Sequence, residues 1–134
     1  MVALVALSGV ATAQPDDPEA RPPSQFSQAY DTCMDKSGGI TNAMLDCSAE
    51  EQRRQDARLN QAYKKVMDAS GPERKQKLRE VERAWIAYRD TSCSLLAEFQ
   101  GGTVASLAVS DCVLQRTAER AKWLVDLTEL AGSE

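Results

Sequence analysis

The chain has 134 residues, of which 43% are hydrophobic and 27% are charged, and it contains four cysteines and no histidine. This length provides for one ordinary domain, and the apolar content is too high for a disordered chain. Sixteen Lys+Arg against twenty Asp+Glu give a formal net charge of −4, whereas a dedicated nucleic-acid binder should carry a basic surplus. Histidine is the commonest general base and the commonest metal ligand in enzymes. Its absence argues against Ser-His-Asp catalysis, Cys-His catalysis and an ordinary zinc enzyme.

Residues 1–13, MVALVALSGVATA, predict a signal peptide. An apolar run ends in Ala11-Thr12-Ala13, an A-x-A cleavage pattern. The run is far shorter than the roughly 20 apolar residues of a membrane-spanning helix. No Lys or Arg precedes it, so we expect the true start of the signal to lie upstream. Residues 14–24 hold four of the five prolines and predict an extended tether, which disfavours the alternative of an N-terminal core helix. We therefore expect a protein that is periplasmic or secreted after cleavage near Ala13, with no membrane span.

From residue 25 onward the apolar spacing is helical, and paired glycines or Gly-Pro mark the turns. The pattern predicts a short helix over about 25–36 and a second over 41–69 with Thr41 as its N-cap. A third helix is expected over 72–100 and a fourth over 103–130. Short turns between long helices favour antiparallel neighbours. The predicted fold is all-α: a disulfide-linked up-and-down bundle of three long antiparallel helices plus a short N-terminal helix, over residues 25–131.

The four cysteines, in an exported chain of this size, predict two disulfides with three possible connectivities. Cys33 and Cys47 are nearly equidistant from the turn at Gly39, and Cys93 and Cys112 from the turn at Gly102. Residues equidistant from a hairpin turn face each other across the two helices, within the short reach of a disulfide. We therefore predict the pairs Cys33–Cys47 and Cys93–Cys112.

The predicted third helix carries a line of residues at heptad-like spacing that we expect to face the bundle interior. Its members are Leu78, Val81, Trp85, Tyr88, Ser92, Leu95 and Phe99. The predicted second helix has a thinner apolar stripe, which includes Tyr63, and a charged stretch over 49–56 that we interpret as a solvated face with one or two internal polar contacts. Glycosidase chemistry by Asp46, Glu50 and Glu51 is disfavoured because an exposed stretch offers no apolar pocket for an acid.

The segment ERAWIAYRDTSC, residues 82–93, resembles the signature of the lysozyme-inhibitor LprI-like N-terminal domain family. Supporting matches are the other three cysteines and the strings Leu59-Asn60-Gln61-Ala62-Tyr63 and Gly101-Gly102-Thr103, followed by Thr117, Arg120 and Leu124. The resemblance covers about residues 33–127 and implies a small, exported, cysteine-containing protein associated with lysozyme inhibition. The chain has no lipobox cysteine, so it resembles a soluble member of the family and not a lipid-anchored one.

Within that signature we expect structural roles first. Trp85 and Tyr88 should be core residues, since aromatics at helical spacing normally pack. Arg89 should bridge to a carboxylate or to helix-end carbonyls, and both Arg89 and Asp90 have the alternative of a partner contact. Asn60 and Gln55 are expected to join this polar network. We expect no catalytic residue, no metal ligand and no cofactor.

Three functions remain open. The first is a binding protein that inhibits lysozyme, because an acidic protein is attracted to a cationic one. The inserted element would be the turn at Gly38–Thr41, the turn at Gly101–Thr103, or a basic side chain such as Lys36, and the sequence does not select among them. The second is a periplasmic structural or interaction module with no lysozyme activity. The third and most remote is an enzyme. Oligomeric state is not predicted.

Overall fold

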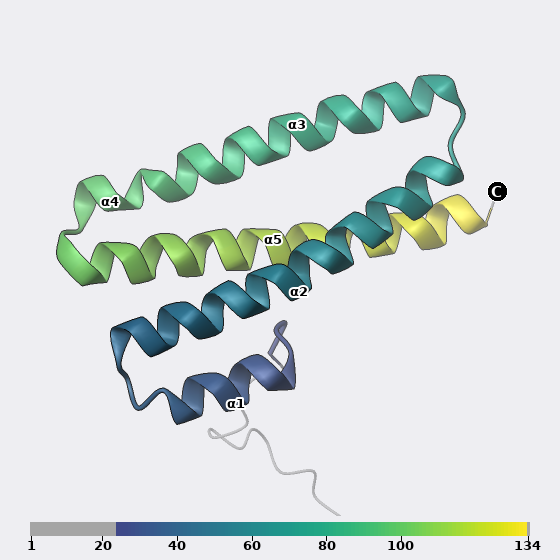
Figure 1. The fold of residues 1–134 in the computed structure, drawn as a ribbon. Helices are drawn as coiled ribbons and strands as arrows, with labels where there is room; N and C mark the ends of the chain where they lie inside the picture. Colours follow the sequence, from purple (N-terminus) through teal and green to yellow (C-terminus); the bar gives the residue numbers. More distant parts are fainter. Residues whose placement is uncertain (1–23, 134) are drawn as a thin grey trace, which may run out of the picture.

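The structure is a computed structural model that describes residues 24–133 (Figure 1). The predicted signal peptide and all of the predicted tether except Ser24 lie outside these residues. The described part of the chain is helical and contains no strand, which confirms the predicted all-α fold. Its helices are α1 (Gln28–Lys36), α2 (Thr41–Asp68), α3 (Pro72–Ser94), α4 (Leu96–Phe99) and α5 (Gly102–Gly132).

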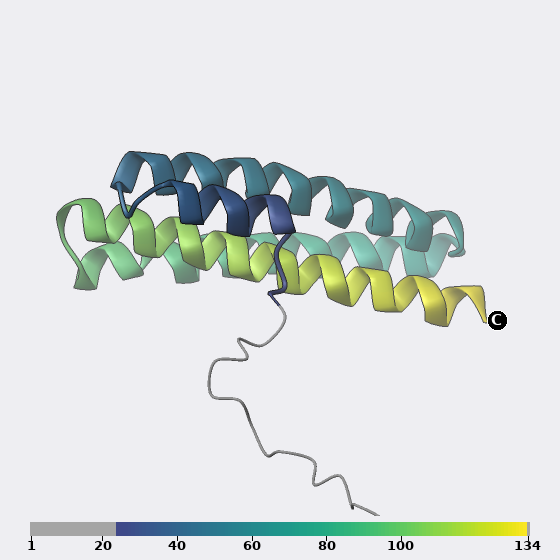
Figure 2. The ribbon, with the colours of Figure 1, turned by 90° about the horizontal axis from the view of Figure 1, so that it is seen from below.

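The helices form an elongated bundle in which α2 and α5 both begin at one end and α3 runs back antiparallel to them (Figures 1 and 2). The central element is α5, which contacts α2, α3 and α4, whereas α1 packs against α2. The turns that precede α2 and α5 therefore lie at the same end of the molecule. The turn at Gly71 and the C-terminal end of α5 lie at the other end. No helix within residues 24–133 has the length and apolar character needed to cross a membrane.

The helix ends follow local chemistry, and several differ from the predicted bounds. The first helix begins at Gln28 and not near residue 25, because Ser27 is its N-cap and its side chain accepts from the Tyr30 amide. Thr41 is the first helical residue and not the N-cap of α2, because Ile40 holds the extended cap position without a side-chain hydrogen bond. The predicted helix over 72–100 is divided at Leu95, where Ser94 Oγ donates to the Thr91 carbonyl. Such a bond competes with the helical ladder. The last helix begins at Gly102, whose φ of 61° lies in the left-handed region that suits glycine.

The core divides into two clusters that both lie between α2 and its neighbours. Alanines on α2 and α5 allow these two helices to approach closely, which explains how a thin apolar stripe suffices on α2. The larger cluster contains Leu59, Ala62, Val66, Leu78, Ala121 and Leu124. The smaller cluster contains Tyr30, Cys47 and Leu114.

The prediction that α3 turns its whole heptad line inward is wrong. Leu78 is buried and Trp85 is half-buried, but Val81 and Leu95 are exposed, as is Tyr88 with 57% of its surface accessible. The physical reason is that α3 packs chiefly on one long helix, α5, over most of its length. Residues at heptad spacing form a stripe with two sides, and a single neighbouring helix covers only one of them.

Candidate functional site

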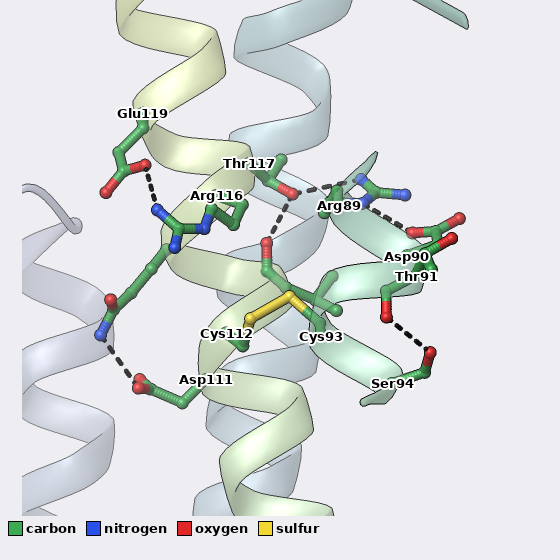
Figure 3. Close-up of a disulfide and its surroundings, with 12 residues drawn as sticks. Arg89, Asp90, Thr91, Cys93, Ser94, Asp111, Cys112, Arg116, Thr117 and Glu119 are labelled. Carbon is green, nitrogen blue, oxygen red and sulfur yellow. Dashed lines mark hydrogen bonds and ion pairs between the residues drawn. A yellow bond between two sulfur atoms is a disulfide. The ribbon is translucent and has the colours of Figure 1, made fainter. Parts of the chain in front are cut away.

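Both predicted disulfides are confirmed, and both lie near the end of the bundle where α2 and α5 begin. Cys33 of α1 is bonded to Cys47 of α2 with the Cα atoms 5.8 Å apart. Cys93 of α3 is bonded to Cys112 of α5 with the Cα atoms 5.6 Å apart (Figure 3). We refer to residues 31–50 and 90–112, which contain these bonds, as the disulfide-bonded end. Each bond joins helices on the two sides of a turn, so both turns are fixed in place.

Large apolar side chains are exposed on the disulfide-bonded end. Phe99 of α4 is 79% accessible, and Ile40, at the turn before α2, is 65% accessible. Val104 at the start of α5 and Leu95 between α3 and α4 are also exposed. A single exposed apolar residue is ordinary, whereas several at one end of a small protein are a feature of binding surfaces.

The disulfide-bonded end is also strongly acidic. It carries seven Asp+Glu and a single basic residue, Lys36. The corresponding segments of the opposite end, residues 58–68, 72–82 and 122–132, carry eight Lys+Arg and six Asp+Glu. The small net charge of the whole chain therefore conceals an electrostatic polarity along the bundle. The acidic carboxylates in question are Asp31, Asp35, Asp46, Glu50, Asp90, Glu98 and Asp111.

A buried carboxylate holds the start of α1 against α2. Glu51 is fully buried, and its two oxygens accept hydrogen bonds from the backbone amide of Ser27 at 2.9 Å and from the Ser27 hydroxyl at 2.6 Å. Arg54 Nε donates at 2.6 Å and Gln55 Nε2 at 2.8 Å. Burial opposes ionisation of Glu51, but these hydrogen bonds outweigh it and lower its pKa.

The surroundings of Glu51 test two predictions made from the sequence. Glu51 was expected on a solvated face and is instead inside the protein, so that expectation is wrong. Gln55 makes an internal polar contact, but its partner is Glu51 and not the network of Arg89, so the expectation that Gln55 joins that network is also wrong. A glycosidase needs an acid with a raised pKa and a second carboxylate at a fixed distance, whereas the pKa of Glu51 is lowered. Residues 24–133 also contain no cluster of three side chains suited to hold a metal ion.

A second internal arrangement stacks charged and aromatic side chains between α3 and α5. The guanidinium of Arg120 lies 4.0 Å from the ring centre of Trp123 and 5.5 Å from that of Trp85. The same guanidinium is paired with Glu82 at 2.8 Å, and both side chains are largely buried. Arg89 lies over Trp85 at 4.9 Å. Cation–π contacts of this kind fix the position of an aromatic ring without a fully apolar surrounding.

Arg89 links this stack to α2 through Thr117. One of its terminal nitrogens donates to Thr117 Oγ1 at 3.3 Å (Figure 3). Gln52 of α2 donates to the same oxygen at 3.0 Å. The Arg89 Nε atom donates to Asp90 at 2.8 Å. The expected bridge from Arg89 to a carboxylate therefore exists, although the partner is its own chain neighbour. Asn60 is exposed on α2, outside this network.

The residues singled out from the signature segment thus have different surroundings. Trp85 is half-buried in the stack, and Tyr63 is half-buried against the larger core cluster. Tyr88 is exposed, so the prediction that it belongs to the core is wrong. Sequence reasoning missed the pair of Glu82 and Arg120, since nothing in the spacing of two charged residues 38 positions apart shows that they meet.

The comparisons with known proteins agree with the sequence signature. The family model described as lysozyme inhibitor LprI matches residues 33–124. An uncharacterized protein of Rhizobium meliloti is 32% identical over 99 residues, which cover 63% of this chain and 71% of the relative. No solved structure matches the chain. The matched residues include all four cysteines, the arginine–tryptophan stack and most of α2, α3 and α5, and the chain therefore belongs to the LprI lysozyme inhibitor family.

Proposed function

We propose that the protein is exported to the cell envelope and that it binds and inhibits lysozyme through its disulfide-bonded end. Membership of the LprI family supports a lysozyme as the partner. The two disulfides support an oxidising compartment. The observation that carries the choice of surface is the coincidence of acidic charge and exposed apolar side chains at the end where both covalent bonds lie.

The chemistry of this end fits a cationic protein with a concave site. Lysozymes are commonly cationic, so seven carboxylates at one end attract and orient the partner during encounter. Exposed aromatic and aliphatic residues then provide the desolvated contacts that contribute most to affinity. Phe99 is the most exposed large apolar residue of the described chain and is the last residue of α4, just before the turn into α5.

The test is the muramidase activity of a c-type lysozyme at increasing amounts of the purified mature domain, at low and at physiological salt. We expect loss of activity at a one-to-one ratio, with a weaker effect at higher salt because screening shortens the reach of the charges. Phe99→Ala should raise the concentration for half inhibition at least tenfold. Tyr88→Ala is the matched control, since Tyr88 is an exposed aromatic of α3 outside this end, and it should leave inhibition within twofold.

Electrostatic steering is tested separately. Glu98→Lys combined with Asp46→Lys changes the charge of this end by four, and we expect a slower association rate with a dissociation rate that changes little. Full muramidase activity at a tenfold molar excess of the protein would contradict the proposal. That outcome would favour the alternative function, an envelope interaction module without lysozyme activity.

A further inference from the structure

An apolar pocket lies at the opposite end of the bundle and is lined by residues of α2, α3 and α5. The end of α2, the start of α3 and the end of α5 meet at this end (Figure 1). Its volume is about 300 Å³, which is the lower limit of small-molecule sites. Seven of its nine lining residues are apolar. Leu78 is part of the buried core, while Val81, Trp123 and Leu130 are exposed, so the pocket opens from the core to the surface.

The two remaining lining residues are both cations. Arg74 and Lys77 lie about one turn apart near the N-terminus of α3, and none of the pocket's lining residues within the described range 24–133 is acidic. Lys77 has no ion pair with any residue of the described range 24–133. The N-terminus of α3 adds the partial positive charge of the helix dipole to the same rim. The pocket thus combines an apolar interior with a positive edge.

We infer that this pocket binds one acyl chain of a fatty acid, with the carboxylate at Lys77. A peptide segment would bring backbone N–H and C=O groups among seven apolar side chains that offer them no hydrogen bonds, which costs several kcal/mol per group. An acyl chain has no such groups. The positive rim favours an anionic head group over a neutral or cationic one.

The test uses the whole mature protein and sodium dodecanoate below its micelle concentration, followed by titration calorimetry. We expect saturable binding at one site, with the fluorescence of the pocket residue Trp123 changing over the same range. Affinity should increase about fourfold for each methylene from octanoate to dodecanoate, the factor expected for burial of one CH₂ group. Dodecyltrimethylammonium has the same chain with the opposite charge and should bind at least tenfold more weakly.

Two variants assign the binding to this pocket. Lys77→Glu should weaken dodecanoate at least tenfold and strengthen the trimethylammonium compound. Leu130→Glu places a carboxylate at the mouth, where the side chain is 66% exposed and the fold tolerates the change, and it should abolish dodecanoate binding. Ile86→Glu is the matched control, since Ile86 is an exposed aliphatic residue of α3 outside the pocket, and it should leave binding unchanged.

Several results would overturn the inference. These are the absence of saturable dodecanoate binding, equal affinity for the two head groups, or dodecanoate binding that survives Leu130→Glu. Sedimentation that shows a dimer in the parent protein and a monomer in Leu130→Glu would assign the pocket to a second copy of the chain instead. None of these measurements involves lysozyme, so they are independent of the proposed function.

Discussion

Glu51→Gln is the most informative single substitution, because it preserves the shape of a fully buried side chain while removing its charge. In the parent protein Oε1 accepts from the Ser27 amide and from Gln55, and Oε2 accepts from the Ser27 hydroxyl and from Arg54. With the new amide nitrogen at the Oε2 position, the Ser27 hydroxyl reverses to accept. Arg54 then loses its acceptor and turns to water, because its side chain is 39% exposed.

The expected decrease in unfolding free energy arises because the remaining hydrogen bonds are made to a neutral amide and no longer to a charged carboxylate. A hydrogen bond to a charged group contributes about 1.5–3 kcal/mol and a neutral one about 0.5–1.5 kcal/mol. Two to three bonds each weakened by about 1 kcal/mol, together with the lost arginine pair, give a decrease in unfolding free energy of about 2–4 kcal/mol. Urea denaturation at pH 7 measures this difference. Amide exchange should show the loss concentrated at the first turn of α1, which Ser27 caps.

The pH dependence distinguishes the charge from the shape. The pKa of Glu51 is lower in the folded protein than its ordinary value of 4.5. Its stabilisation is therefore complete above about pH 4.5 and is lost as the pH falls through the lower folded value. The difference in unfolding free energy between the parent and Glu51→Gln should be largest at pH 7 and should decrease below pH 4. An equal deficit at pH 7 and at pH 3 would refute the reasoning.

Three further predictions concern α3, α5 and the covalent bonds. Arg120→Met leaves the largely buried Glu82 carboxylate without its cation, and we expect a loss of about 3–5 kcal/mol in urea denaturation; a loss under 1 kcal/mol would show that water replaces the arginine. Trp85→Ala should cost about 2–4 kcal/mol, since the half-buried indole also carries two cation–π contacts. Tyr88→Ala, measured in parallel, should stay within about 0.5 kcal/mol because that ring is exposed. Reduction of both disulfides should lower the denaturation midpoint by an amount equivalent to about 2–4 kcal/mol per bond, and an unchanged midpoint would contradict a stabilising role.

The fold was predictable because its signals are local. Turn residues such as Gly38-Gly39 and Gly71-Pro72 interrupt long stretches of helical spacing, and short turns restrict the order of the helices in space. The cysteine pairing followed from the same topology, since each pair flanks one turn. Helix type, helix order and covalent links therefore needed only information from neighbouring stretches of the chain.

The candidate site was less predictable because it depends on which flank of a helix has a neighbour. The line from Val81 to Phe99 has the spacing of a core, but α3 packs mainly on α5 and one flank stays open. Glu51 has the composition of a surface residue and is buried because Ser27, 24 positions earlier, folds back onto it. The acidic end was visible only after the topology brought residues 31–50 and 90–112 together.

The separation of the paired cysteines has a consequence for oxidative folding. The two native bonds close loops of only 14 and 19 residues, whereas either of the other pairings must close two loops that are several times longer. Because the probability of loop closure falls as about the three-halves power of length, the native pairing is favoured roughly 50-fold before any tertiary contact forms. Each disulfide also joins two cysteines of the same helical hairpin, so either bond can form before the other. A reduced, newly made chain can thus reach its correct covalent state from either end, with little need for disulfide isomerisation.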